Sequence, residues 1–135
     1  MITSTVKYLG ELRTEAVHLK SGNEIITDAP TDNHGKGEAF SPTDLVATAL
    51  ASCMISVMGI LSMKENITKT DGATAEVTKI MYPDPRRIGE VHITITMPKN
   101  NFSDKEKKMY ENAAHTCPVA KSLHPDLKQV ITFVW

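Results

Sequence analysis

The spacing of apolar and polar positions changes along the 135 residues, and each change predicts another kind of element. Strands are predicted where β-type residues alternate or lie between turn signals, and one central segment shows strict period-two alternation. The six predicted strands are residues 3–9, 14–19, 24–27, 73–81, 91–97 and 128–134. The first three form a meander. The segment 28–40 after them is rich in Gly, Pro, Asp and Asn, which predicts a loop of a length that is often functional.

A long helix is predicted from Pro42 to about Glu65. Ser41 can cap its first turn, Pro42 suits the first helical position, and the charge of Asp44 lies near the positive helix end. The 19 residues from Leu45 to Met63 carry no charge. Apolar residues occur all round this helix, so we expect other parts of the fold to enclose it on most sides.

Two shorter helices are predicted over 103–115 and 118–123. The strands come in groups rather than alternating singly with helices, which predicts an α+β fold with antiparallel sheets around the long buried helix. The length of the chain suits one domain over residues 1–135.

Composition excludes several classes of partner. The 15 basic and 16 acidic side chains give a net charge of −1, and no basic block points to nucleic acid. The uncharged run is long enough to span a bilayer, but small and hydroxyl side chains such as Thr48, Ser52 and Gly59 interrupt it. We therefore expect a core helix and no membrane. The N-terminus lacks the apolar core of a secretion signal, so a cytoplasmic location is predicted.

Two cysteines, 64 positions apart, carry the candidate chemistry. Cys117 precedes Pro118 at a predicted helix start, where the helix dipole favours a thiolate. Cys53 lies inside the long helix and would need a positive charge from elsewhere to react as a thiolate. Where thiols are kept reduced, a cysteine pair is more often redox-active than structural. The plain alternative is that Cys53 is a small core residue.

A zinc site is the rival interpretation of the same region. His115, Cys117 and His124, or Cys53 with His34, would offer suitable nitrogen and sulfur ligands. No CxxC or HExxH spacing is present. We therefore expect neither a metal nor a prosthetic group.

The segment SPTDLVATALASCM, followed some sixty residues later by CPVAKSL, resembles the OsmC/Ohr family of osmotically inducible and organic hydroperoxide resistance proteins. The resemblance covers most of the chain. It implies an intertwined homodimer in which sheets wrap two long central helices, with an active site at each end of the interface. It also implies thiol-dependent reduction of organic hydroperoxides in oxidative-stress defence.

In this resemblance Cys53 matches the peroxidatic cysteine and Cys117 the resolving one. A Cys53 thiolate would attack the O–O bond and become a sulfenic acid. Cys117 would condense with it to a disulfide, which an external dithiol reductant would reopen. The apolar surroundings suit a lipid-like hydroperoxide.

The chain departs from the hydroperoxidase pattern in two ways. Those branches carry Glu directly after the helix-start proline, whereas Thr43 stands here, and the neighbouring Asp44 is rotated by about 100° round the helix. They also carry an arginine in the preceding loop or on an N-terminal strand, and loop 28–40 has none. The candidates for stabilising the Cys53 thiolate are therefore the chain's three arginines, Arg13, Arg86 and Arg87.

These departures keep a second function open. A small-ligand-binding or redox-sensing protein could keep the fold without efficient peroxidase activity.

Overall fold

The computed structural model describes all residues from Met1 to Trp135, which pack into two compact units, Met1–Val46 and Ala47–Trp135. The division falls within the long helix α1, Pro42–Glu65. Each unit is described by itself. The α+β class with a central helix is confirmed, while one domain over residues 1–135 stays a prediction.

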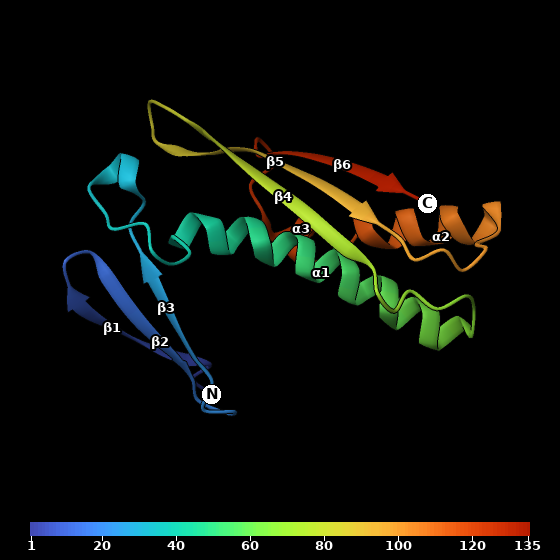
Figure 1. The fold of residues 1–135 in the computed structure, drawn as a ribbon, viewed down its shortest axis with the longest axis horizontal. Coiled ribbons are helices and arrows are strands. Elements are labelled where there is room, and N and C mark those ends of the chain that lie inside the picture. Colours follow the sequence, from blue (N-terminus) through green and yellow to red (C-terminus); the bar gives the residue numbers. More distant parts are fainter. The chain divides into compact units, whose positions relative to one another are not determined.

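The N-terminal unit contains the predicted meander, an antiparallel sheet in the order β1-β2-β3 (Figure 1). Its strands are β1 (Ser4–Gly10), β2 (Arg13–His18) and β3 (Glu24–Asp28). Val6 and Tyr8 stand opposite Ala16 and Thr14 on one face. The exposed fractions of Val6 and Tyr8 are 66% and 63%, so this apolar face is uncovered in a single chain.

The second sheet, in the order β4-β5-β6, corrects one prediction. Its strands are β4 (Thr74–Tyr82), β5 (Arg87–Thr96) and β6 (Lys128–Val134). β4 and β5 form the expected antiparallel hairpin, but β6 runs parallel to β5. The expectation of wholly antiparallel sheets is therefore wrong for this pair. The chain between β5 and β6 passes through α2 (Asp104–His115) and α3 (Pro118–Ser122), and such a helical crossover suits parallel strands.

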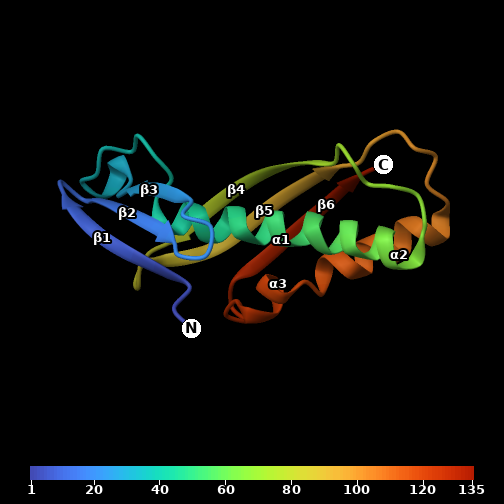
Figure 2. The ribbon, with the colours of Figure 1, turned by 90° about the horizontal axis from the view of Figure 1, so that it is seen from below.

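The core of the second unit lies between this sheet and the helices, which lie on one of its faces (Figure 2). Val91, Ile93 and Ile95 on β5 are at most 1% exposed, and Leu50 and Met54 of α1 are fully buried. Burying one such side chain stabilises a fold by about 1.5–3 kcal/mol. The alternation seen in the sequence of β5 therefore places its apolar side against the helices.

Only one face of α1 is buried within a single chain. Its exposed or half-exposed side chains repeat every three or four residues, which forms a stripe along the helix. We call these six residues the α1 stripe: Val46, Ala49, Cys53, Ser56, Ile60 and Met63. By length and composition α1 could cross a membrane, but its other face packs in the core as that of a globular protein does. The sequence predicted that other parts of the fold enclose this helix on most sides, and a single chain does not provide that enclosure.

A cavity of about 710 Å³ borders the C-terminal half of this stripe. Ser56, Gly59, Ile60 and Met63 line it on the helix side, and the loop after α1 lines it opposite. A Cβ atom at Gly59 would meet no atom within 4 Å. There is therefore open space directly above the helix at this point.

Hydrogen bonds from α2 and its N-cap hold the loop after α1 in place. Glu106 accepts hydrogen bonds from the backbone N–H and the hydroxyl of Thr68, at 2.8 and 3.0 Å, and from the backbone N–H of Ser103 at 3.0 Å. Tyr110 donates its hydroxyl to the carbonyl of Thr68. The backbone donors, that of Ser103 first, lower the pKa of Glu106 to about 2.

Candidate functional site

The structure brings the two predicted cysteines together. Cys53 is half-buried on α1, and Cys117 is fully buried at the start of α3. Both are free thiols. The Cys53 thiol lies close enough to hydrogen-bond with Cys117, and this contact is among the causes that raise the pKa of Cys117.

Cys117 occupies the position that the sequence predicted, the N-cap of α3, with Pro118 in the first turn. Its sulfur accepts a hydrogen bond from the backbone N–H of Ala120 at 3.4 Å. The N–H groups of Ala120 and Val119 favour the thiolate, but burial opposes it more strongly, so the pKa of Cys117 is raised overall. The buried thiol is therefore held protonated, with the N–H of Ala120 directed at its sulfur.

The surroundings of the pair are apolar. Cys117 belongs to the core of the second unit, and Cys53 packs against that core from α1. Val119, Ala120 and Leu123 of the α3 region pack against the same core. In such a pair the half-exposed thiol can react first with a reagent from solvent, and the buried thiol can then form a disulfide with it.

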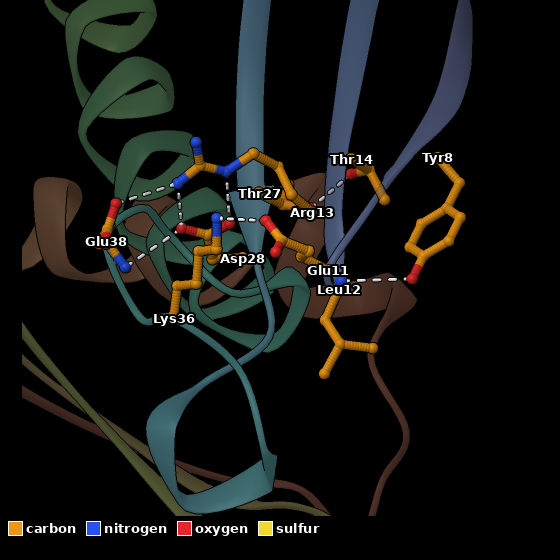
Figure 3. Close-up of polar contacts among 9 residues, drawn as sticks. All are labelled: Tyr8, Glu11, Leu12, Arg13, Thr14, Thr27, Asp28, Lys36 and Glu38. Atoms are coloured by element: carbon orange, nitrogen blue, oxygen red, sulfur yellow. Dashed lines mark hydrogen bonds and ion pairs between the residues drawn. The ribbon is translucent and has the colours of Figure 1, made fainter.

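Arg13, one of the three candidate arginines, lies in the N-terminal unit and is held by two carboxylates (Figure 3). Its Nε and Nη2 donate to the two oxygens of Asp28 at 2.7 and 2.9 Å, and Nη2 also contacts Glu38 at 3.3 Å. Asp28 is fully buried, and the bond from Arg13 is the first cause that lowers the pKa of its carboxyl. The backbone N–H of Glu38 donates to Asp28 at 3.1 Å. Arg13 is thus rigidly held.

The other two arginines lie at the turn between β4 and β5. The Arg87 guanidinium lies 5.3 Å from the centre of the Tyr82 ring and donates to the carbonyl of Pro85 at 3.4 Å. Arg86 immediately precedes β5. The causes that shift the pKa of Cys117 are burial, backbone donors and the Cys53 thiol. An arginine partner for Cys53 stays a prediction.

Asp44 and Thr43, the possible supporting residues, take part in the cap of α1. Asp44 accepts from the Ser41 backbone N–H at 3.0 Å and donates its own N–H to the Ser41 hydroxyl at 3.0 Å. The hydroxyls of Thr43 and Ser41 are 3.2 Å apart. The two reciprocal bonds between Asp44 and Ser41 form a capping box, so the role of Asp44 in starting the helix is enough to explain an acid at this position.

The rival zinc interpretation gains no support from the geometry. No three His, Cys, Asp or Glu side chains lie together in a way that could hold a metal ion. His115 instead packs its ring edge against Phe133, with 5.8 Å between ring centres.

Sequence reasoning missed Asp28 and Glu38 as partners of Arg13. The signal was present in part, because Arg13 and Asp28 are directly paired positions on neighbouring strands. Finding it requires the strand register, which the turn between β2 and β3 sets.

Comparison with known proteins gives the family. The family model of the OsmC-like protein matches residues 35–131. A proposed osmotic stress induced and detoxification response protein of Psychrobacter arcticus 273-4 is 59% identical, with 98% of this chain and 96% of that chain covered and a TM-score of 0.93. No curated protein matches.

Two more distant structures share the fold. The organic hydroperoxide resistance protein OsmC of Legionella pneumophila is 18% identical, with coverage of 100% and 98% and a TM-score of 0.75. The organic hydroperoxide resistance protein OhrB of Bacillus subtilis is 16% identical, with coverage of 98% for both chains and a TM-score of 0.66. The family model and the Psychrobacter relative show that the chain belongs to the OsmC-like protein family.

Proposed function

We propose that this protein is a thiol peroxidase that reduces organic hydroperoxides in oxidative-stress defence. The observation that carries the proposal is the pairing of a half-exposed Cys53 with a buried Cys117 in an apolar setting. Relatives of the same fold are named for organic hydroperoxide resistance. We expect it to act in the cytoplasm, where thiols are kept reduced.

The chemistry divides between the two thiols. The Cys53 thiolate attacks the outer oxygen of the hydroperoxide, the O–O bond breaks, and the alkoxide leaves as an alcohol after it gains a proton. The sulfenic acid on Cys53 then reacts with Cys117, which forms an S–S bond and releases water. A dithiol reductant reopens the disulfide by exchange and is itself oxidised to a disulfide. No cofactor is needed.

The order of the two cysteines follows from their surroundings. A thiol reacts as its thiolate, and burial keeps Cys117 protonated. Cys53 is the accessible one of the two. This supports Cys53 as the attacking residue and Cys117 as the residue that resolves the sulfenic acid.

We propose further that the active form is a homodimer. The α1 stripe contains Cys53, is uncovered in a single chain, and includes Ile60 and Met63 with exposed fractions of 54% and 84%. The β1-β2-β3 sheet, taken by itself, also has an exposed apolar face. A second copy would shield both surfaces from water and enclose the thiol pair.

The test is consumption of cumene hydroperoxide with a dithiol as electron donor. We expect turnover by the wild type, loss of the reaction in Cys53→Ser, and one slow turnover without disulfide in Cys117→Ser. Equal and negligible rates in wild type and Cys53→Ser would contradict peroxidase activity.

The thiolate-stabilising arginine is tested by alkylation of Cys53 as a function of pH. We propose that Arg86 or Arg87 supplies the charge, with Arg13 as the other candidate. In Arg86→Ala or Arg87→Ala the alkylation profile should then move to higher pH. An unchanged profile in all three alanine variants would exclude arginine from this role.

A binding protein without efficient turnover is the second candidate. Thr43 in place of the family acid and the loop without arginine favour it. A slow disulfide cycle with no steady consumption of hydroperoxide would support a redox sensor, and the absence of both would support a binding protein.

A further inference from the structure

One polar side chain interrupts the row of β6 that faces the core. This row is otherwise apolar, with Ile131 and Phe133 packed against the core cluster. Gln129 belongs to the same row and pairs in register with Val91, which is fully buried. A polar residue here loses hydration and must gain a hydrogen bond in return.

That bond connects β6 with α3. The side-chain amide of Gln129 donates from Nε2 to the backbone carbonyl of Ala120 at 3.2 Å. α3 has five residues, which is too short to be stable without support. Carbonyls in the last helical turn also have no partner within the helix. Gln129 supplies this partner from the sheet.

The same Ala120 also contacts the sulfur of Cys117. Its N–H donates to Cys117 Sγ at 3.4 Å, so Ala120 is held on one side by Gln129 and touches the thiol on the other. If Ala120 shifts, the distance between its N–H and the sulfur changes with it. The sheet thereby fixes the donor that faces the buried thiol.

We propose that Gln129 is a positioning residue for the resolving step, in which Cys117 attacks the sulfenic acid of Cys53. The proposal rests on the proposed peroxidase function. In this step the Cys117 sulfur forms the S–S bond, the S–O bond of the sulfenic acid breaks, and the thiol proton leaves with the hydroxyl group as water. Cys117 attacks as its thiolate, whose proton passes to the leaving hydroxyl, and a well-placed N–H of Ala120 stabilises this thiolate.

The test separates the two chemical steps. One equivalent of cumene hydroperoxide is added to reduced protein, and mass spectrometry follows the sulfenic acid, trapped with dimedone, and the disulfide. In Gln129→Met, which keeps the length of the side chain but cannot donate, we expect unchanged oxidation of Cys53. Disulfide formation should slow about fivefold to tenfold, as expected for one lost hydrogen bond, so the trapped sulfenic acid should accumulate.

Two further variants exclude a general loss of structure. Ile131→Val lies in the same row of the same strand and should form the disulfide at the wild-type rate. Gln129→Glu cannot donate when ionised but can when protonated. Its disulfide rate relative to wild type should therefore recover as pH falls, which a purely structural defect would not do.

The outcomes distinguish the two proposals. A wild-type disulfide rate in both Gln129 variants would overturn the role of Gln129 and leave the peroxidase intact. If the wild type forms neither sulfenic acid nor disulfide, the peroxidase proposal fails. The pH profile of Cys117 alkylation then decides about Gln129, since a profile moved to higher pH in Gln129→Met supports positioning and an unchanged one refutes it.

Discussion

Glu106 shows how a single carboxylate can fix a loop. It accepts three hydrogen bonds, two from Thr68 and one from Ser103, and its pKa falls from the ordinary value of 4.5 to about 2. Because the folded pKa is lower than the unfolded one, its contribution to stability is complete above about pH 4.5. The contribution is lost as the pH falls towards 2.

We therefore expect Glu106→Gln to lower the urea midpoint at pH 7 and to differ much less from wild type near pH 2. Urea unfolding of both proteins between pH 7 and pH 2 measures this difference in midpoint. Glu111→Gln, on the same helix, is the matched control and should unfold like wild type at every pH. An equal difference between Glu106→Gln and wild type at pH 7 and pH 2 would contradict the explanation.

Gly89 is the second case at the scale of a residue. A Cβ atom there would lie 2.2 Å from ring atoms of Tyr82, whose hydroxyl donates to Glu90 at 2.6 Å. Gly89→Ala must displace this ring, and we expect a loss of about 1–3 kcal/mol in the free energy of unfolding. In a Tyr82→Ala background the same change should cost far less, so a double-mutant cycle from urea unfolding will show strong coupling. Additive effects would contradict the contact.

At the scale of elements, the α1 stripe predicts assembly. Gly59→Leu adds an apolar side chain where a single chain leaves open space, so a monomer tolerates it and a helix packed on the stripe does not. We expect sedimentation at micromolar concentration to show a dimer for wild type and a shift to monomer for Gly59→Leu. Glu65→Leu, an exposed position about 100° round the helix from the edge of the stripe, is the control and should stay dimeric. A wild-type monomer would contradict the dimer proposal.

The elements themselves were largely predictable because their signals are local. The capping chemistry of Ser41, Pro42 and Asp44 placed the start of α1 at the residue where the structure begins it. The direction of β6 was not predictable, since it depends on the path of a crossover that contains two helices. Similarly, the cysteines were visible in the sequence, but the bonds of Arg13 to Asp28 and of Gln129 to Ala120 depend on strand register and packing between distant segments.

At the scale of the whole molecule, α1 extends across the boundary of the two units. Unfolding of either unit removes packing from part of one helix, so we expect a single cooperative transition. The three tyrosines provide separate probes, since Tyr8 lies in the first unit and Tyr82 and Tyr110 in the second. With 3-fluorotyrosine, the native NMR signals of all three should disappear at the same urea concentration. Earlier loss of the Tyr8 signal would show two independent domains.

The position of β6 at the edge of its sheet has a practical consequence for handling the protein. Gln129–Val134 is uncharged and rich in β-branched and aromatic residues, and one side of its backbone has no neighbouring strand in the sheet. Such an edge is a template on which other chains can add as strands and grow into insoluble aggregates. Shelf life at high concentration will then depend on this strand. A lysine at the exposed position Thr132 should prolong it while leaving the core untouched.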